Sequence, residues 1–201
     1  MLYADMLGPI LIEAPGCPEM VCERVLHDAV LDFYREVALW VHHDEAAQIE
    51  TTGALTLTLP DDSEVVTVRQ LRTDIGAIEP RTVDEFMYRE HTEGDPAIVV
   101  EINGAWLVRP APSEVTAAVA TVQLAPVYGC DGVVDAVAHR HRRLYEHLAL
   151  ARLLVMPRQP WTDVQRAGYH AGQATRLRFE LQRRTDGWST LRTPVVRYGG
   201  I

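Results

Sequence analysis

The feature that most constrains the fold is the spacing of apolar residues, which changes from helical to extended and back again. Residues 19–42 place apolar side chains three and four positions apart, so that these side chains share one helix face. Between residues 47 and 126 the spacing becomes two, as in "ALTLTLP" at 54–60. Helical spacing returns in "DGVVDAVAHRHRRLYEHLALARLLVM" at 131–156. The pattern predicts helices in both end regions of the sequence, with strands between them.

The middle of the chain is predicted to be a β-module of several strands. Further strands are expected in "EVVTVRQL", "AIVVEI", "AWLVRP" and "EVTAAVATVQLAP". Asn103 and Gly104 join two of them, and this dipeptide favours the positive φ angles of a type I′ hairpin turn. Asp61 and Asp62 lie in a second polar turn, "PDDS", and a short helix is expected near "TVDEFMYRE".

A second C-terminal helix is expected after the helix that Pro157 ends. Thr162 or Asp163 can cap it, and it should run to about Arg184. Its small residues cluster on one side and favour close approach of another helix; they are Ala167, Ala171 and Ala174. The preceding stretch, residues 148–163, is apolar on every side, which raises the question of what covers it.

The last sixteen residues, 186–201, have no helical period and are predicted to form an extended arm. Pro194 disfavours helix at Thr193, and the segment has little polar cover. The arm's apolar residues are Trp188, Leu191, Val195, Val196, Tyr198 and Ile201.

Together these elements predict an α+β protein, a helical bundle with an inserted antiparallel β-module and an extended C-terminal arm. One long N-terminal and two long C-terminal helices would form the bundle. The expected boundaries are 1–46 for the N-terminal segment and first helix, 47–126 for the β-module, 127–185 for the helix pair and 186–201 for the arm.

Charge is segregated along the chain, whose formal net charge is −9. Residues 1–138 contain 7 Arg and 24 acidic residues, and residues 139–201 contain 12 Arg and 4 acidic residues. All 19 basic residues are Arg and none is Lys, a bias that a GC-rich genome by itself explains. Such a split suits head-to-tail association of copies, although pairing of the same surfaces within one copy explains it equally well. Arg140, Arg142 and Arg143 form either an exposed basic turn or a contact with an acidic neighbour or a nucleic-acid backbone.

No targeting or membrane segment is expected. The N-terminus has no basic region before an apolar run, and no apolar run approaches the ~18–20 residues of a membrane span. Cys17, Cys22 and Cys130 are few and odd in number, which favours reduced thiols in a cytoplasmic environment.

A search for catalytic and cofactor motifs predicts no enzyme and no cofactor. The chain has no phosphate-binding glycine loop, and no serine is flanked by the glycines of a nucleophile elbow. His42, His43 and Asp44 are the best metal candidates, but two histidines at the end of a helix explain them better. A small metal-dependent hydrolase using these three residues remains an alternative.

The order of helix, β-module, helix pair and arm resembles the head-to-tail adaptor proteins of tailed bacteriophages, also called connector, head-completion, gatekeeper or tail tubular protein A-like proteins. The resemblance lies in "CERVLHDAVLDFYREVALWV", in "LTLTLPDDSEVVTV" and in "LALARLLVMPRQPW" with the Ala-rich helix that follows. It spans most of residues 19–184.

The resemblance implies a structural virion protein, assembled in the host cytoplasm, that forms a ring of about twelve copies in the neck of the virion. The ring would join the portal protein to the tail or nozzle protein, and genome DNA would pass through without sequence-specific binding. The arm would dock on the portal, and the loops at Asp61, Asp62, Asn103 and Gly104 would face the tail. The small-residue helix side and Arg140, Arg142 and Arg143 would contact neighbouring subunits. Another ring protein of the same machinery, a tail terminator or a stopper, is the alternative.

Overall fold

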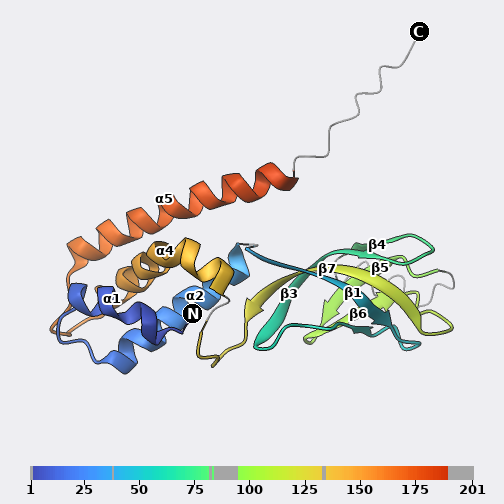
Figure 1. Cartoon of the computed structure of the whole chain (residues 1–201), viewed down its shortest axis with the longest axis horizontal. Coiled ribbons are helices and arrows are strands. Elements are labelled where there is room, and N and C mark those ends of the chain that lie inside the picture. The colour runs from blue at the N-terminus through green and yellow to red at the C-terminus, as the bar shows by residue number, and fades with distance from the viewer. Residues whose placement is uncertain (1, 38, 82, 84–94, 133–134, 190–201) are drawn as a thin grey trace, which may run out of the picture. The chain divides into compact units, whose positions relative to one another are not determined.

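The computed structural model describes residues 2–37, 39–81, 83, 95–132 and 135–189 (Figure 1). By its internal contacts the chain divides into two compact units. The helical unit comprises residues 1–33 and 131–201, and the sheet unit comprises residues 34–130.

The helical unit contains the long helices that the apolar spacing predicts. A 3₁₀ turn at Ala4–Met6 leads into a short helix, so that this unit also has a buried N-terminal element. The α-helices of the described residues are α1 (Leu7–Glu13), α2 (Glu19–Glu36), α4 (Asp135–Leu153) and α5 (Val164–Ser189). The last three residues of α2 group with the sheet unit.

The apolar end of α4 is covered by the helical unit itself. Ala149, Leu150, Leu153 and Leu154 are all buried, and α4 packs along α5 and against α1. Elsewhere in the unit, Phe33 and Tyr145 meet edge to face with ring centroids 6.0 Å apart. Burial within the same chain therefore explains most of the apolar character of residues 148–154.

Helix α5 starts where its cap predicts and extends further than expected. The Asp163 carboxylate accepts a hydrogen bond from the Arg166 backbone N–H at 3.0 Å, as an N-cap does. The helix continues to Ser189, so residues 186–189 are helical and the extended arm was predicted to begin four residues too early. The remainder of the predicted arm, residues 190–201, lies outside the described residues.

Two histidines hold α4 and α5 together inside the helical unit. The Nδ1 atoms of His147 and His170 lie 2.9 Å apart, a hydrogen bond in which one ring donates and the other accepts. Burial lowers the pKa of His147, with Arg143 acting in the same direction and Glu146 in the opposite one. Burial also lowers the pKa of His170, and His147 and Arg166 add to this effect. Arg166 forms an ion pair with Glu13 of α1, and Glu146 with Arg142.

We expect this pair to make the helical unit less stable in mild acid. Both pKa values are lower in the folded protein than the usual 6.5, so unfolding takes up protons. The stability that the neutral pair contributes is complete above pH 6.5 and is lost as the pH falls through the folded-state pKa values. Thermal melts followed by the helical circular dichroism signal should show this loss, and His170→Gln should flatten the pH dependence. The control is His139→Gln, at an exposed position of α4; a flattening of the same size in this control would contradict the prediction.

The sheet unit is a seven-stranded mixed sheet in the order β2-β1-β7-β3-β4-β5-β6. Its strands are β1 (Trp40–Ile49), β2 (Leu55–Thr56), β3 (Ser63–Arg72), β4 (Ala77–Pro80), β5 (Ile98–Ile102), β6 (Ala105–Arg109) and β7 (Thr116–Pro126). The pairs are antiparallel except β4 with β5, which are parallel. A bridge between Ala54 and Leu107 links the first and last strands of this order, so the sheet nearly closes into a barrel.

The barrel has an apolar core of its own. Long strands β1 and β3 both pair with β7, whose inward residues Ala118, Ala120, Val122 and Leu124 are buried. Asp44 is only 4 % exposed, and its carboxylate accepts hydrogen bonds from the backbone N–H groups of Ala46 and Thr58 at 2.9 and 2.6 Å. The Asp44 carboxylate thereby connects a bulge in β1 with the segment that follows β2.

The predicted fold class, a helical bundle with an inserted antiparallel β-module, is wrong. The strands form a nearly closed mixed barrel with its own core, and the fold is sheet-rich. One cause is that α2 ends at Glu36, whereas the spacing predicted a helix to residue 42. Trp40 keeps the helical spacing from Val37 by coincidence, since it pairs with Leu124 of β7 as the first residue of β1. Tertiary pairing overrides a local helical pattern here.

Candidate functional site

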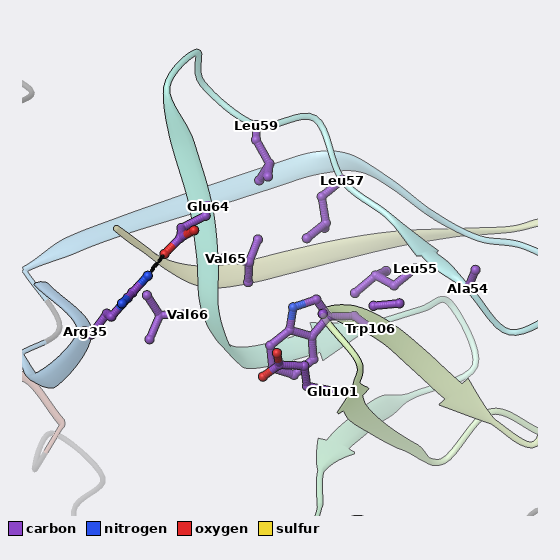
Figure 2. A pocket seen from close by; sticks show the side chains of 12 residues that line it. Arg35, Ala54, Leu55, Leu57, Leu59, Glu64, Val65, Val66, Glu101 and Trp106 are labelled. Carbon is purple, nitrogen blue, oxygen red and sulfur yellow. Dashed lines mark hydrogen bonds and ion pairs between the residues drawn. The ribbon is translucent and has the colours of Figure 1, made fainter. Parts of the chain in front are cut away.

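The sheet unit contains an apolar groove with a volume of about 670 Å³ (Figure 2). Its apolar lining comes from the segment after β1 and from β3 and β6, and consists of Ala54, Leu55, Leu57, Leu59, Val65, Val66, Ala105 and Trp106. Its polar lining consists of Arg35, Glu64 and Glu101, and Gly104 completes it. We call this hollow the sheet groove.

The apolar residues that line the sheet groove lie at the edge of the barrel core and are partly exposed. Leu55, Leu57 and Leu59 are separated by two, so an extended segment points all three the same way. These leucines, Val65 and Trp106 are half-buried and pack against the buried core residues. Their outer surfaces therefore remain available to another molecule.

Strand β4 contacts its neighbours over only a few residues. β4 pairs with β3 only at Leu71 and Arg72, and with β5 only at Ile98 and Val99. Within the described residues, no strand pairs with residues 63–70 on the edge of β3 that faces away from β7. A register shift between Val65 and Thr67 makes Val66 an extra residue, and both Val65 and Val66 line the groove.

Charged groups stand at the rim of the sheet groove. Arg35 donates two hydrogen bonds to Glu64 Oε1, at 2.8 Å from Nη2 and 3.3 Å from Nε, and this ion pair is drawn in Figure 2. Glu101 is the cross-strand partner of Trp106 in the pairing of β5 with β6, and it is exposed. Among the contacts of the described residues, Glu101 has no ion-pair partner.

A second hollow of about 650 Å³ adjoins the first in the sheet unit. Glu101 and Trp106 line both hollows, and the second adds residues of β3, β4 and β5. Trp106 therefore lines two hollows of the sheet unit.

The two predicted tail-facing loops border the sheet groove. Asp61 and Asp62 form an exposed turn between Leu59 and Glu64, both of which line it. Asn103 and Gly104 form the predicted hairpin turn, with φ angles of +52° and +78°, and Gly104 lines the groove. The sequence predicts both loops but not the hollow beside them. Its alternating leucines at 55–59 predict one strand, whereas only Leu55 and Thr56 form β2.

The predicted subunit-interface residues separate into two groups. Ala167 and Ala174 are buried on the side of α5 that packs on its own chain, whereas Ala171 is exposed. Arg142 is ion-paired with Glu146 and donates to the Asp5 carbonyl. Arg140 and Arg143 are exposed and are therefore accessible to a neighbour.

The predicted arm residues are mostly beyond what the structure describes. Trp188 falls in the last turn of α5. Leu191, Val195, Val196, Tyr198 and Ile201 lie outside the described residues, and their docking role stays a prediction.

The metal candidates lie on a strand, not at the end of a helix. His42 and His43 are consecutive residues of β1 and so point to opposite faces of the sheet. His42 Nε2 is 3.0 Å from the Thr58 carbonyl oxygen and His43 Nδ1 is 3.0 Å from Thr121 Oγ1. Asp44 is occupied by its two backbone donors, so the three side chains do not converge on one ion.

Comparisons with known proteins add no family assignment: no protein-family model matches the chain, and no curated protein is significantly similar to it. In the described part of the chain, no group of three or more His, Cys, Asp or Glu side chains is placed to hold a metal ion. None of the described helices combines the length and the apolar character that crossing a bilayer requires.

Proposed function

We propose that this protein is a structural virion protein, a head-to-tail adaptor whose copies form a ring between portal and tail. The observation that carries the proposal is an uncovered face of α5. Six residues on that face recur at spacings of three and four, and they are Val164, Gly168, Ala171, Gly172, Thr175 and Phe179. We call these six residues the outer stripe.

The outer stripe has the composition of a helix-packing surface, and its residues are exposed in the part of the chain that the structure describes. All six residues are exposed, with Val164 at 70 % and Phe179 at 63 %. A methyl group built on Gly168 or Gly172 would meet no atom of the described residues within 4 Å, apart from the adjacent backbone of its own helix. Two glycines inside a helix cost about 1 kcal/mol each against alanine, a cost that close approach of another helix can offset.

The opposite face of α5 packs against α4 of the same chain. Ala167, His170, Ala174 and Leu181 are buried on the side that packs on α4. A second copy packing on the outer stripe forms a heterologous contact, and repetition of such a contact around an axis closes a ring.

The distribution of charge suits a DNA channel. The sheet unit contains 6 Arg and 16 acidic residues, a net formal charge of −10. An acidic surface repels the phosphate backbone and lets DNA slide, whereas a basic surface would retain it. In this proposal the DNA passes through without being bound.

Native mass spectrometry of the full-length chain mixed with portal rings tests the proposal. We expect about twelve adaptor copies per portal ring, as the resemblance implies. Truncation after Ser189 should abolish binding to the portal and leave the helical signal intact, because it removes the proposed docking arm and no part of α5. A single adaptor copy per portal ring, or a ring that binds only the end of a tail tube, would contradict the adaptor role; the second result would identify a tail terminator.

A further inference from the structure

We infer that a basic hollow lined by α4 and α5 receives the exposed turn between β3 and β4 of a second copy of this chain. The hollow has a volume of about 520 Å³ and is lined by residues 139–144 of α4 and by Leu177, Glu180 and Leu181 of α5. We call it the helix hollow, and we call residues 73–76 the strand turn. That this contact contributes to a ring rests on the function proposed above, whereas the fit of the two surfaces rests on their own residues.

The helix hollow has positive charge that is not compensated among the described residues. Its α4 side contains Arg140, Arg142 and Arg143. Arg142 is paired with Glu146 at 2.9 Å, and Glu180, the one carboxylate among the described lining residues, is itself ion-paired within α5. Arg140 and Arg143 are exposed, and neither has an ion-pair partner among the contacts of the described residues. The hollow therefore suits a carboxylate, with which a guanidinium group forms paired hydrogen bonds.

The α5 side of the helix hollow is mainly apolar. Leu177 is half-buried, and Leu181 is buried together with Leu144 of α4. A basic side and an apolar side thus border the same space, so its occupant should present a carboxylate and an apolar side chain close together. A space of this size holds a small ligand or a few side chains, and the tip of a turn meets that limit.

The strand turn presents this combination of side chains. Asp74 and Ile75 are its two central residues, both are exposed, and Ile75 is 59 % exposed. The Thr73 backbone N–H donates to the Gly76 carbonyl at 2.9 Å, which holds the turn closed. A methyl group built on Gly76 would meet no atom of the described residues within 4 Å beyond its chain neighbours. The turn can therefore enter the hollow end-on, with the carboxylate of Asp74 toward the arginines of α4 and the side chain of Ile75 toward the leucines of α5.

The distribution of charge between the two units favours a second copy of this chain as the occupant. The sheet unit, which contains the strand turn, has a net formal charge of −10, whereas the helical unit contains 13 Arg and 12 acidic residues. A sheet unit is therefore attracted to the basic hollow of another copy and repelled by another sheet unit. A projecting turn and a hollow elsewhere on the same molecule form a heterologous contact, and such a contact can repeat around a ring.

Exchange of one pair of charges tests the contact. Asp74→Arg and Arg140→Glu should each weaken self-association of the full-length protein at least tenfold, measured by sedimentation equilibrium over a range of concentrations. The double variant Asp74→Arg/Arg140→Glu again places opposite charges at every contact between copies and should recover most of the association. Ile75→Ser should weaken association about tenfold, because the shorter polar side chain buries less apolar area against α5.

Two variants outside the contact serve as matched controls. Glu114→Arg makes the same change of charge as Asp74→Arg in an exposed loop before β7, and Arg24→Glu matches Arg140→Glu at an exposed position of α2. Both should leave association unchanged. Equal weakening by the controls, a double variant that stays dissociated, or an unchanged protein that is monomeric at every concentration would overturn the inference. A double variant that recovers thermal stability instead of association would also overturn it, since the two surfaces would then pair within one copy.

The outcome is separable from that of the proposed function. An Asp74→Arg protein that fills portal rings as the unchanged protein does would overturn the strand turn as a contact between copies and leave the adaptor role intact. Association of the free protein that follows the exchange of charge, with no ring on portal proteins, would support the contact and contradict the adaptor role.

Discussion

Replacing Gly172 by Arg should abolish ring assembly while the monomer folds normally. Gly172 is in the middle of the outer stripe, and a methyl group built there meets no atom of the described residues within 4 Å beyond its own helix backbone, so we expect the longer side chain to have room in the free protein. In a close helix–helix contact the same side chain would hold two backbones apart and bring an unpaired charge into an apolar surface. Native mass spectrometry with portal rings should show no adaptor ring, and the helical circular dichroism signal should equal that of the unchanged protein.

Gly172→Ala is the matched control for that experiment. Alanine is a better helix former than glycine by about 1 kcal/mol, and its methyl group extends into open space, so the free monomer should become more stable. Rings should still form, because the stripe stays apolar and nearly as narrow. If the Gly172→Arg protein assembles as well as the control, the outer stripe is not the contact between copies.

The sequence predicts those elements whose signals are local. The Asn103–Gly104 turn, the cap at Asp163 and strands β3, β5, β6 and β7 are all near their predicted places, since turn chemistry and apolar alternation are read within a few residues. Strand β1 was not predicted. At its start Val37 and Trp40 keep a helical spacing, while Trp40 pairs with Leu124, which is more than eighty positions away.

The sheet groove could not be predicted, because its lining comes from segments that are far apart in the sequence. Strand β4 contains only Ala77–Pro80, and its parallel pairing with β5 has no signal in the local sequence. The turns at Asp61–Asp62 and Asn103–Gly104 were predicted from their turn residues, but the space beside them follows from long-range register. Similarly, the small residues of α5 were recognised as a packing surface, but which side faces its own chain depends on α4. Ala167 and Ala174 proved to be inside and Ala171 outside.

Replacing Tyr145 by Ala should remove about 3–5 kcal/mol from the stability of the helical unit. Tyr145 is fully buried in α4 and meets the ring of Phe33 in α2 edge to face. The substitution leaves a cavity between two long helices and removes an aromatic pair, and a loss of this size is a large fraction of the stability of a domain. The matched control is Phe179→Ala, which deletes an aromatic ring of similar size at an exposed position of α5 and should change stability by less than about 0.5 kcal/mol.

The same substitution tests whether the two units unfold separately. Each unit has its own buried core, so loss of the Tyr145 ring acts directly only on the helical one. Native-state hydrogen exchange of the Tyr145→Ala protein should show faster exchange at amides of α2, α4 and α5, while amides of β3 and β7 keep their protection. An equal loss of protection in the strands would mean that the helices and the barrel unfold as one cooperative unit.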